Sequence, residues 1–494
     1  MSQPESSSLV DRLDALYEYD REPIKENKLH GHKTFIAMFA GEHVAGTELV
    51  LGPLMLAHGV TAKDFFLGLI VGNLLAVLSW ALICAPIAVK TRLTIYWQLK
   101  KIAGPYLMVI YSALYAVVLC LLAGAMVQVS TSAVSLLFPA IHNPESSAWL
   151  ASPSWITLAV FVGAVIAVLA VLGFEKLAHF SKICAPWMAL VFAACGIAVL
   201  PQLGVTGLGD LWTVFDEKIF TGVPFEGFSK YTFWHVAGFA WLCNAAQHLG
   251  MSDITIFRYA KKWTSGFASA FGMYIGHFMA WISSALLCAA YVKINEGATS
   301  FPPGEIGFLG AGLAGAILVV IAGWTTANPT LYRAGLAIQV ATPNWQRWQV
   351  TFLAGGVMIV LACIPALLKS LDLVVASYGL FFLPFGACVL MDYWVLPKIG
   401  LKRNFAELAN IGFSWPTFVA WIGSFLPLWL LWAKDNVAFL KWINDIVPGF
   451  IADLHVELMF LALPAWIAAM ILYVVCSTIQ QKNAPAHLTQ TAQA

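Results

Sequence analysis

Charged residues are scarce in this chain. Asp, Glu, Lys and Arg together make up 11% of its 494 residues, whereas soluble domains run near a quarter. With 60% hydrophobic residues and a mean hydropathy of +0.78, this scarcity predicts an all-α, polytopic membrane protein. The net charge of +1 comes without a basic stripe or a long charge run, so nothing in it predicts a nucleic-acid partner.

Several functional signatures are also missing. GxxxxGK[ST] is absent, which argues against an ATP-driven pump within this chain. The 9 Cys are scattered through apolar segments without CxxC or Cys/His ligand spacing, so we interpret them as small buried hydrophobes. Residues 1–33 hold no apolar signal-peptide core, and we expect the first span to direct insertion. No constellation of catalytic residues is visible, and we predict that the chain is not an enzyme.

Apolar stretches long enough to cross a bilayer number about twelve. We expect spans at residues 34–58, 65–89, 105–138, 155–173, 178–200, 232–256, 266–292, 306–341, 349–368, 371–396, 415–433 and 457–477. The cations fall on one set of alternate loops: Lys90, Arg92, Lys100, Lys101, Lys176, Lys182, Arg258, Lys261, Lys262, Arg333, Arg347, Lys398, Lys402 and Arg403. This asymmetry predicts cytoplasmic termini in the inner or plasma membrane.

Two acids stand inside the first span. Glu42 and Glu48 lie among apolar residues with His43 and several glycines. Ionisable groups inside a span usually line a protein interior or an aqueous cavity, and the glycines suggest an interrupted helix of the kind that carries transporter sites. Glu42 could accept from an aminated substrate, or carry a proton with His43. It could equally pair structurally with His43 or another span. Glu48 shares that cavity only if the helix is broken, because six residues turn it away from Glu42 on a regular helix.

Polar residues also collect in spans three, six and eight. Trp241, Asn244 and Gln247 combine a stacking face with amide donors and acceptors. Gly250 is expected to unwind span six, and Pro329 to interrupt span eight. The Thr325 and Thr326 hydroxyls suit an alkali cation, although such hydroxyls more often bond their own backbone. We interpret Asp253 as an end residue that is solvated or paired near Arg258 and Lys261.

Short motifs in matching order across residues 35–400 resemble the nucleobase–cation symporter-1 family of cytosine, purine, allantoin and hydantoin permeases. They are Phe65-Phe66-Leu67, Gly72-Asn73-Leu74-Leu75, Lys90-Thr91-Arg92-Leu93, Phe257-Arg258-Tyr259-Ala260-Lys261, Trp324-Thr325-Thr326-Ala327-Asn328, Leu331-Tyr332 and Asp392-Tyr393-Trp394-Val395.

The resemblance implies a LeuT-type fold of five plus five inverted-repeat spans with two peripheral spans. The chain would then divide into a tail at 1–33, a transport core at 34–400, peripheral spans at 401–477 and a tail at 478–494. Ala322, Thr325 and Thr326 match the family's sodium-binding segment, and Trp241 resembles its stacking Trp. The chain departs from the family at Arg92, where Gly is usual, and has two extra residues between Asp253 and Arg258.

We therefore predict a secondary active symporter that imports a small nitrogen-rich compound with a cation, sodium in the first place. A proton carried by Glu42 and His43 is the alternative, and a channel or a non-transporting receptor is the alternative of another class. The substrate contacts expected are Glu42, His43, Tyr115, Trp241, Asn244, Gln247 and Asn328. No cofactor or obligatory protein partner is expected beyond the coupling ion, the substrate and the bilayer.

Overall fold

The computed structural model describes residues 21–485 except 145–147, 297 and 299, so the expected tails lie partly outside it. Within that part of the chain every regular element is a helix. Nine helical stretches are long and apolar enough to cross a membrane, and they cover residues 62–91, 105–137, 153–171, 174–203, 263–294, 303–341, 371–399, 415–436 and 458–482. The broken segments that form spans one and six, together with the shorter helix α17 (Arg347–Ala362), are further candidate crossings. Counted with the nine helices, they equal the twelve spans expected from the sequence.

The first span is broken, as its glycines and acids predict. α2 (His32–His43) ends at Val44, and α3 (Glu48–Ala57) begins after a four-residue turn. Gly46 lies in this turn, where an added Cβ would come 3.0 Å from a Val129 methyl and 3.2 Å from the Gly323 Cα. The absence of a side chain therefore lets the break pack directly against spans three and eight.

The sixth span is broken twice. α12 (Phe233–Leu242) gives way to the single turns α13 (Ala245–His248) and α14 (Ile254–Phe257). The second interruption follows Gly250, where unwinding was predicted, and its next residue, Met251, has a φ of 63°. A buried, non-glycine residue in the left-handed region is a strained conformation that the surrounding structure must hold.

The eighth span contradicts one prediction. α16 (Pro303–Ala341) runs through Pro329 as a regular helix, and its distortion lies instead at Ala311 and Gly312. A membrane helix tolerates proline when nearby hydroxyls and neighbouring helices satisfy the freed backbone groups. Pro329 leaves the Thr325 carbonyl without its helical donor, and beside it the Thr330 hydroxyl donates to the Thr326 carbonyl at 2.8 Å. The straight part of α16 thus faces both broken spans as one continuous element.

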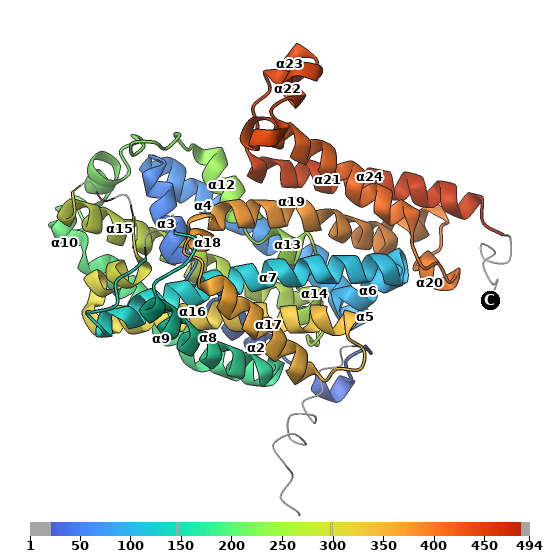
Figure 1. Ribbon diagram of the computed structural model, residues 1–494, viewed down its shortest axis with the longest axis horizontal. Coiled ribbons are helices and arrows are strands. Elements are labelled where there is room, and N and C mark those ends of the chain that lie inside the picture. Colours follow the sequence, from blue (N-terminus) through green and yellow to red (C-terminus); the bar gives the residue numbers. More distant parts are fainter. Residues whose placement is uncertain (1–20, 145–147, 297, 299, 486–494) are drawn as a thin grey trace, which may run out of the picture.

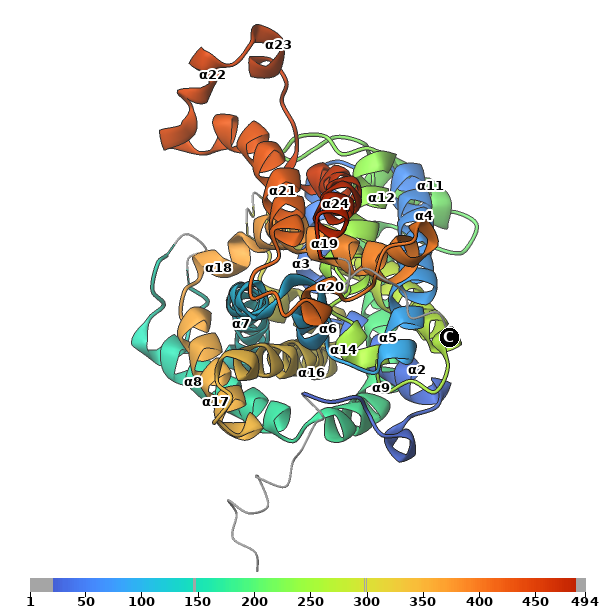
Figure 2. The same cartoon turned by 90° about the vertical axis from the view of Figure 1, so that its right-hand side faces the viewer.

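The remaining spans enclose these three. α7 (Pro105–Val134) packs along α16, whereas α24 (Leu458–Lys482) packs against α19 (Leu371–Leu390) and α21 (Trp415–Asn436) (Figure 1). The other crossings are α4 (Ala62–Ser79) with η2 (Trp80–Cys84) and α5 (Ala85–Thr91), α8 (Pro153–Val171), α9 (Phe174–Ala198), and η6 (Phe271–Phe278) with α15 (Met279–Ile294). α22 (Ile443–Ile446) and α23 (Gly449–Ala452) project from the bundle in both views (Figure 2).

Arg92, which follows α5, stands where the family that the sequence resembles usually has Gly. Arg92 ends this helix with φ 56° and ψ 16°, the left-handed conformation in which glycine is the least strained residue. Its guanidinium lies 3.4 Å from the Glu26 carboxylate at the surface. The chain then continues as α6 (Ile95–Ala103), a short amphipathic helix between two spans.

Candidate functional site

One arginine lies between two acids in the interior. Arg333 of α16 contacts Glu42 at the end of α2, with Nη1–Oε1 at 2.7 Å and Nη2–Oε2 at 3.2 Å. Its Nη2 also donates to Asp253 Oδ1 at 2.6 Å. The Trp80 indole donates to the other oxygen of Asp253 at 2.7 Å. We call Glu42, Arg333 and Asp253 the ionic triad; it ties both broken spans to α16.

The ionic triad corrects two interpretations of the sequence. Asp253 is fully buried and paired with Arg333, so the expectation of an end residue beside Arg258 and Lys261 was wrong. Arg333 was counted among loop cations, yet its side chain is 1% exposed. The missed signal was a cation inside the span predicted at 306–341, because a buried charge requires a partner.

Glu48 lies in a different environment. Its carboxylate accepts from the Thr47 hydroxyl at 3.0 Å and from the Trp281 indole, and lies 3.5 Å from His277 Nε2. Ser284 of α15 donates to the Glu48 carbonyl at 2.7 Å. Glu48 is 1% exposed. The break in span one thus carries two buried acids, one paired with arginine and one surrounded by neutral donors and an imidazole.

Several predicted substrate residues meet near the breaks. Gln247 donates to Glu42 at 3.5 Å, and the Asn244 amide lies 3.2 Å from His277 Nε2. His43 Nδ1 lies 2.9 Å from the Phe39 carbonyl, and its ring centroid is 5.2 Å from that of His277. Side chains from spans one, six and seven therefore form one polar region.

Two predicted contacts lie apart from this polar region. The Trp241 indole nitrogen donates to Ser79 Oγ of span two at 3.1 Å. Tyr115 stacks on Tyr111 and Tyr378, with ring centroids 5.4 and 5.9 Å away, in an aromatic cluster between α7 and α19. Among the described residues, the hydrogen bonds of the ionic triad and of Glu48 go to other side chains.

The predicted sodium segment is internally bonded. The hydroxyls of Thr325 and Thr326 donate to the Ala322 carbonyl at 3.2 and 2.9 Å, which is the alternative foreseen for a threonine pair. A cavity beside them has a volume of about 10 Å³, near what one water molecule requires. It is lined by Met38, Glu42, Leu177, Phe180, Ser181, Thr325, Asn328 and Pro329.

Asn328 makes this small cavity chemically distinctive. Its amide oxygen and nitrogen find no hydrogen-bond partner within the described part of the chain, although the residue is 1% exposed. An unpaired buried amide costs free energy, and Thr325, Ser181 and Glu42 line the same space. Oxygen ligands suit a hard cation, so the residues present fit a small alkali ion or a water molecule.

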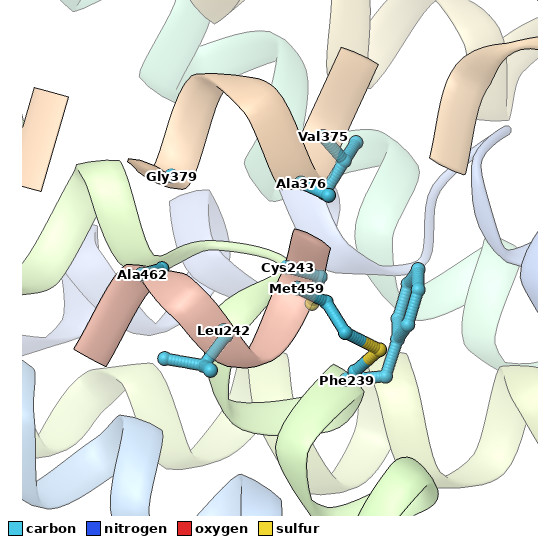
Figure 3. A pocket seen from close by; sticks show the side chains of 8 residues that line it. All are labelled: Phe239, Leu242, Cys243, Val375, Ala376, Gly379, Met459 and Ala462. Carbon is cyan, nitrogen blue, oxygen red and sulfur yellow. The ribbon is translucent and has the colours of Figure 1, made fainter. Parts of the chain in front are cut away.

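A second cavity has the opposite character. It lies between α12, α19 and α24 and is lined by Phe239, Leu242, Cys243, Val375, Ala376, Gly379, Met459 and Ala462 (Figure 3). Its lining offers a thiol and no amide, hydroxyl or charged side chain. Such a lining provides no partners for the donors of a nitrogen-rich compound.

Comparison with solved structures identifies the fold. The transporter Mhp1, described as a nucleobase-cation-symport-1 family member closed with bromovinylhydantoin bound, matches with TM-score 0.70 and 14% identity, covering 97% of this chain and 98% of that one. A Na⁺-coupled sialic acid symporter matches with TM-score 0.63 and 12% identity over 94% of each chain. MhsT in complex with L-phenylalanine matches with TM-score 0.52 and 18% identity, covering 90% and 98%.

No protein-family model and no curated protein matches the sequence. The structural likeness therefore establishes the LeuT-type fold of a multi-pass membrane protein, as predicted. The expectation that the chain is not an enzyme stays a prediction.

Proposed function

We propose that this chain is a cation-coupled secondary active symporter of the nucleobase–cation symporter-1 type that imports a small nitrogen-rich compound. The observation that carries this proposal is the junction of two broken spans with the continuous helix α16. In transporters, discontinuous helices place ion and substrate sites at the bilayer midplane. Polar side chains gather at this junction, and the fold is shared with named symporters.

The proposed substrate contacts are those around the breaks. His43, Asn244 and Gln247 present ring and amide atoms there, and the Gln247 amide oxygen has no partner among the described residues. Trp241 and Tyr115 would join them only after side-chain or helix movement, because each now contacts other elements. Asn328 lines the same small cavity as Glu42. Heterocycles with ring nitrogens and carbonyl groups would match these donors and acceptors.

Sodium is the coupling ion that we propose first. Ala322, Thr325 and Thr326 form the candidate segment, and the adjoining cavity with the unpaired Asn328 amide supports a small cation there. The two threonine hydroxyls can donate to the Ala322 carbonyl and still offer oxygen lone pairs to the ion. Cation binding would then favour one arrangement of the broken spans over another by differential affinity.

The ionic triad supplies the moving contact in this proposal. Glu42 and Asp253 lie on the two broken spans, whereas Arg333 lies on α16. Rocking of the broken spans against α16 would have to break or rearrange these buried ion pairs. We propose that the triad holds the closed state.

A thermal-shift screen with purified protein tests the function. Nucleobases, hydantoins, vitamins and guanidino compounds are each added with sodium or with choline. A ligand present at 100 times its Kd stabilises the folded state by ~2.7 kcal/mol. We expect at least one compound to raise the melting temperature more in sodium, and to accumulate in proteoliposomes with an inward sodium gradient.

Two variants distinguish loss of the ion site from a general loss of stability. Thr326→Ala should abolish the sodium-dependent part of the shift. Thr330→Ala removes a similar hydroxyl bond one turn away and should retain that part. If no compound in the panel stabilises the protein, the substrate class is wrong. If sodium acts equally on both variants, the ion assignment is wrong.

A further inference from the structure

Glu48 is a buried acid that the proposed sodium site and the ionic triad leave unused. Within residues 21–485, apart from the five omitted, no Lys or Arg forms an ion pair with it; its one basic contact is His277 Nε2 at 3.5 Å. Both side chains are almost completely buried, at 1% and 3% exposure. The Thr47 hydroxyl and the Trp281 indole are neutral donors.

The elements around Glu48 supply no compensating cation. α3 packs against α15 and α16. α15 contributes Trp281 and Ser284, and the one arginine of α16, Arg333, is held by Glu42 and Asp253. The other titratable groups facing the pair are Cys243 from span six, and His43 and His248 around His277. With the ordinary pKa values of a thiol and an imidazole, all three groups are mainly neutral at pH 7.

Electrostatics then requires one more positive charge. Burying a carboxylate without a counter-charge costs several kcal/mol even after relaxation, and the N-terminus of α3 offsets roughly half of one charge. A proton supplies the missing charge, whether it is on a carboxylate oxygen of Glu48 or on His277 Nε2. His277 Nδ1 has no partner in the described part of the chain, and Nε2 also lies 3.2 Å from the Asn244 amide nitrogen. A proton on Nε2 therefore requires the Asn244 amide to turn its oxygen toward the ring.

We propose that Glu48 and His277 form a proton-binding site that is loaded when the broken spans close. The proton comes from water on the entry side and is shared between Glu48 and His277 Nε2. It leaves to water when the site opens on the other side. The proposal rests on the proposed symport function and adds a proton to its coupling. It differs from the Glu42–His43 alternative, because Glu42 already pairs with the Arg333 guanidinium, whereas Glu48 pairs with no Lys or Arg among the described residues.

The site predicts a pH dependence of stability that needs no substrate. The folded site would release its proton at a higher pH than the same groups do in the unfolded chain. Between these two pH values the folded protein binds one proton more than the unfolded chain. The folding equilibrium constant should therefore rise tenfold for each unit that the pH falls in that range. Stability gained in this way is present at low pH and is lost as the pH rises.

Melting temperatures of ligand-free protein across pH test the proposal. Glu48→Gln and His277→Gln should each flatten the pH dependence relative to the unmodified protein. Glu305→Gln is the matched control, since Glu305 also accepts from two neutral donors, Asn143 at 2.9 Å and Tyr291 at 2.7 Å. That variant should keep the wild-type slope. An unchanged slope in Glu48→Gln would overturn the proposal.

Infrared spectroscopy provides a second readout for variants of low stability. The wild-type minus Glu48→Gln spectrum should contain the carbonyl stretch of a protonated carboxylic acid, or imidazolium bands if His277 carries the proton. A difference spectrum that shows only an ionised carboxylate and neutral imidazole would contradict the proposal. Both measurements use ligand-free protein, so a failed substrate screen would count against the symporter and leave the proton site standing.

Discussion

Arg333 is a single cation shared by two buried carboxylates that lie 291 and 80 positions away in the chain. The guanidinium suits this task because its planar, always-charged fork can donate to both acids at once. Taking such groups out of water is costly, and the pairing offsets that cost only while every member is present. The triad therefore adds little net stability. Loss of any one of its members should nevertheless be strongly destabilising.

Arg333→Gln should destabilise the protein by about 3–5 kcal/mol, because it leaves two uncompensated buried acids. Melting of purified protein and the yield of monodisperse protein in detergent would report the loss. The triple variant Arg333→Met, Glu42→Gln, Asp253→Asn removes all the charges and should recover most of the stability. Wild-type melting of Arg333→Gln would show that the ionic triad does not form.

The broken spans one and six depend on residues that let helices approach closely. The turn between α2 and α3 packs against α7 and α16 at Gly46, and the interruption after Gly250 places Met251 in the left-handed region. In α16, by contrast, Pro329 does not break the span and stays within a regular helix. At this scale a break is set by how the whole segment packs, and proline alone does not produce it.

Gly46→Ala should destabilise the closed state by about 1–3 kcal/mol through overpacking of the break. The added Cβ would meet Val129 at 3.0 Å and Gly323 at 3.2 Å. Gly356→Ala is the control on α17, where an added Cβ meets nothing within 4 Å, and it should be neutral or slightly stabilising. Equal melting temperatures for the two variants would show that the break tolerates a side chain there.

The whole molecule is a helical bundle whose apolar surface suits a bilayer, and the loop charges predict its orientation. The loop that follows span five carries acids in excess, whereas the loop between spans six and seven carries Lys261 and Lys262. All nine cysteines are buried or half-buried. Introduced surface cysteines can therefore be labelled against a low background.

Gly207→Cys and Lys262→Cys test the orientation with a membrane-impermeant maleimide. Both positions are exposed in the structure. We expect Cys at position 207 to react in intact cells, and Cys at position 262 to react only after permeabilisation. The unmodified protein is the control for the native thiols. Reaction in the reverse order would place both termini on the outer side.

The sequence by itself determined the membrane class and the breaks in spans one and six, whereas its count of twelve crossings stays a prediction beside the nine helices of span length among the described residues. These follow from local composition, because an apolar run of span length has one stable environment, and glycines with acids inside it disfavour an unbroken helix. It also grouped Glu42, His43, Asn244 and Gln247 with Trp241, Tyr115 and Asn328 as substrate contacts, and that role stays a prediction. The fold that this resemblance implied is the fold observed.

The tertiary structure alone decided which charges pair. Arg333 had been assigned to a loop, Asp253 to a span end that is solvated or paired near Arg258 and Lys261, and Pro329 to a break, and each is instead buried within the bundle. Pairing between residues 80 to 291 positions apart is set by helix packing, and periodicity carries information only about neighbours a few residues away. Glu42 thereby became part of an ion pair, and Glu48 remained a buried acid without a fixed cation among the described residues.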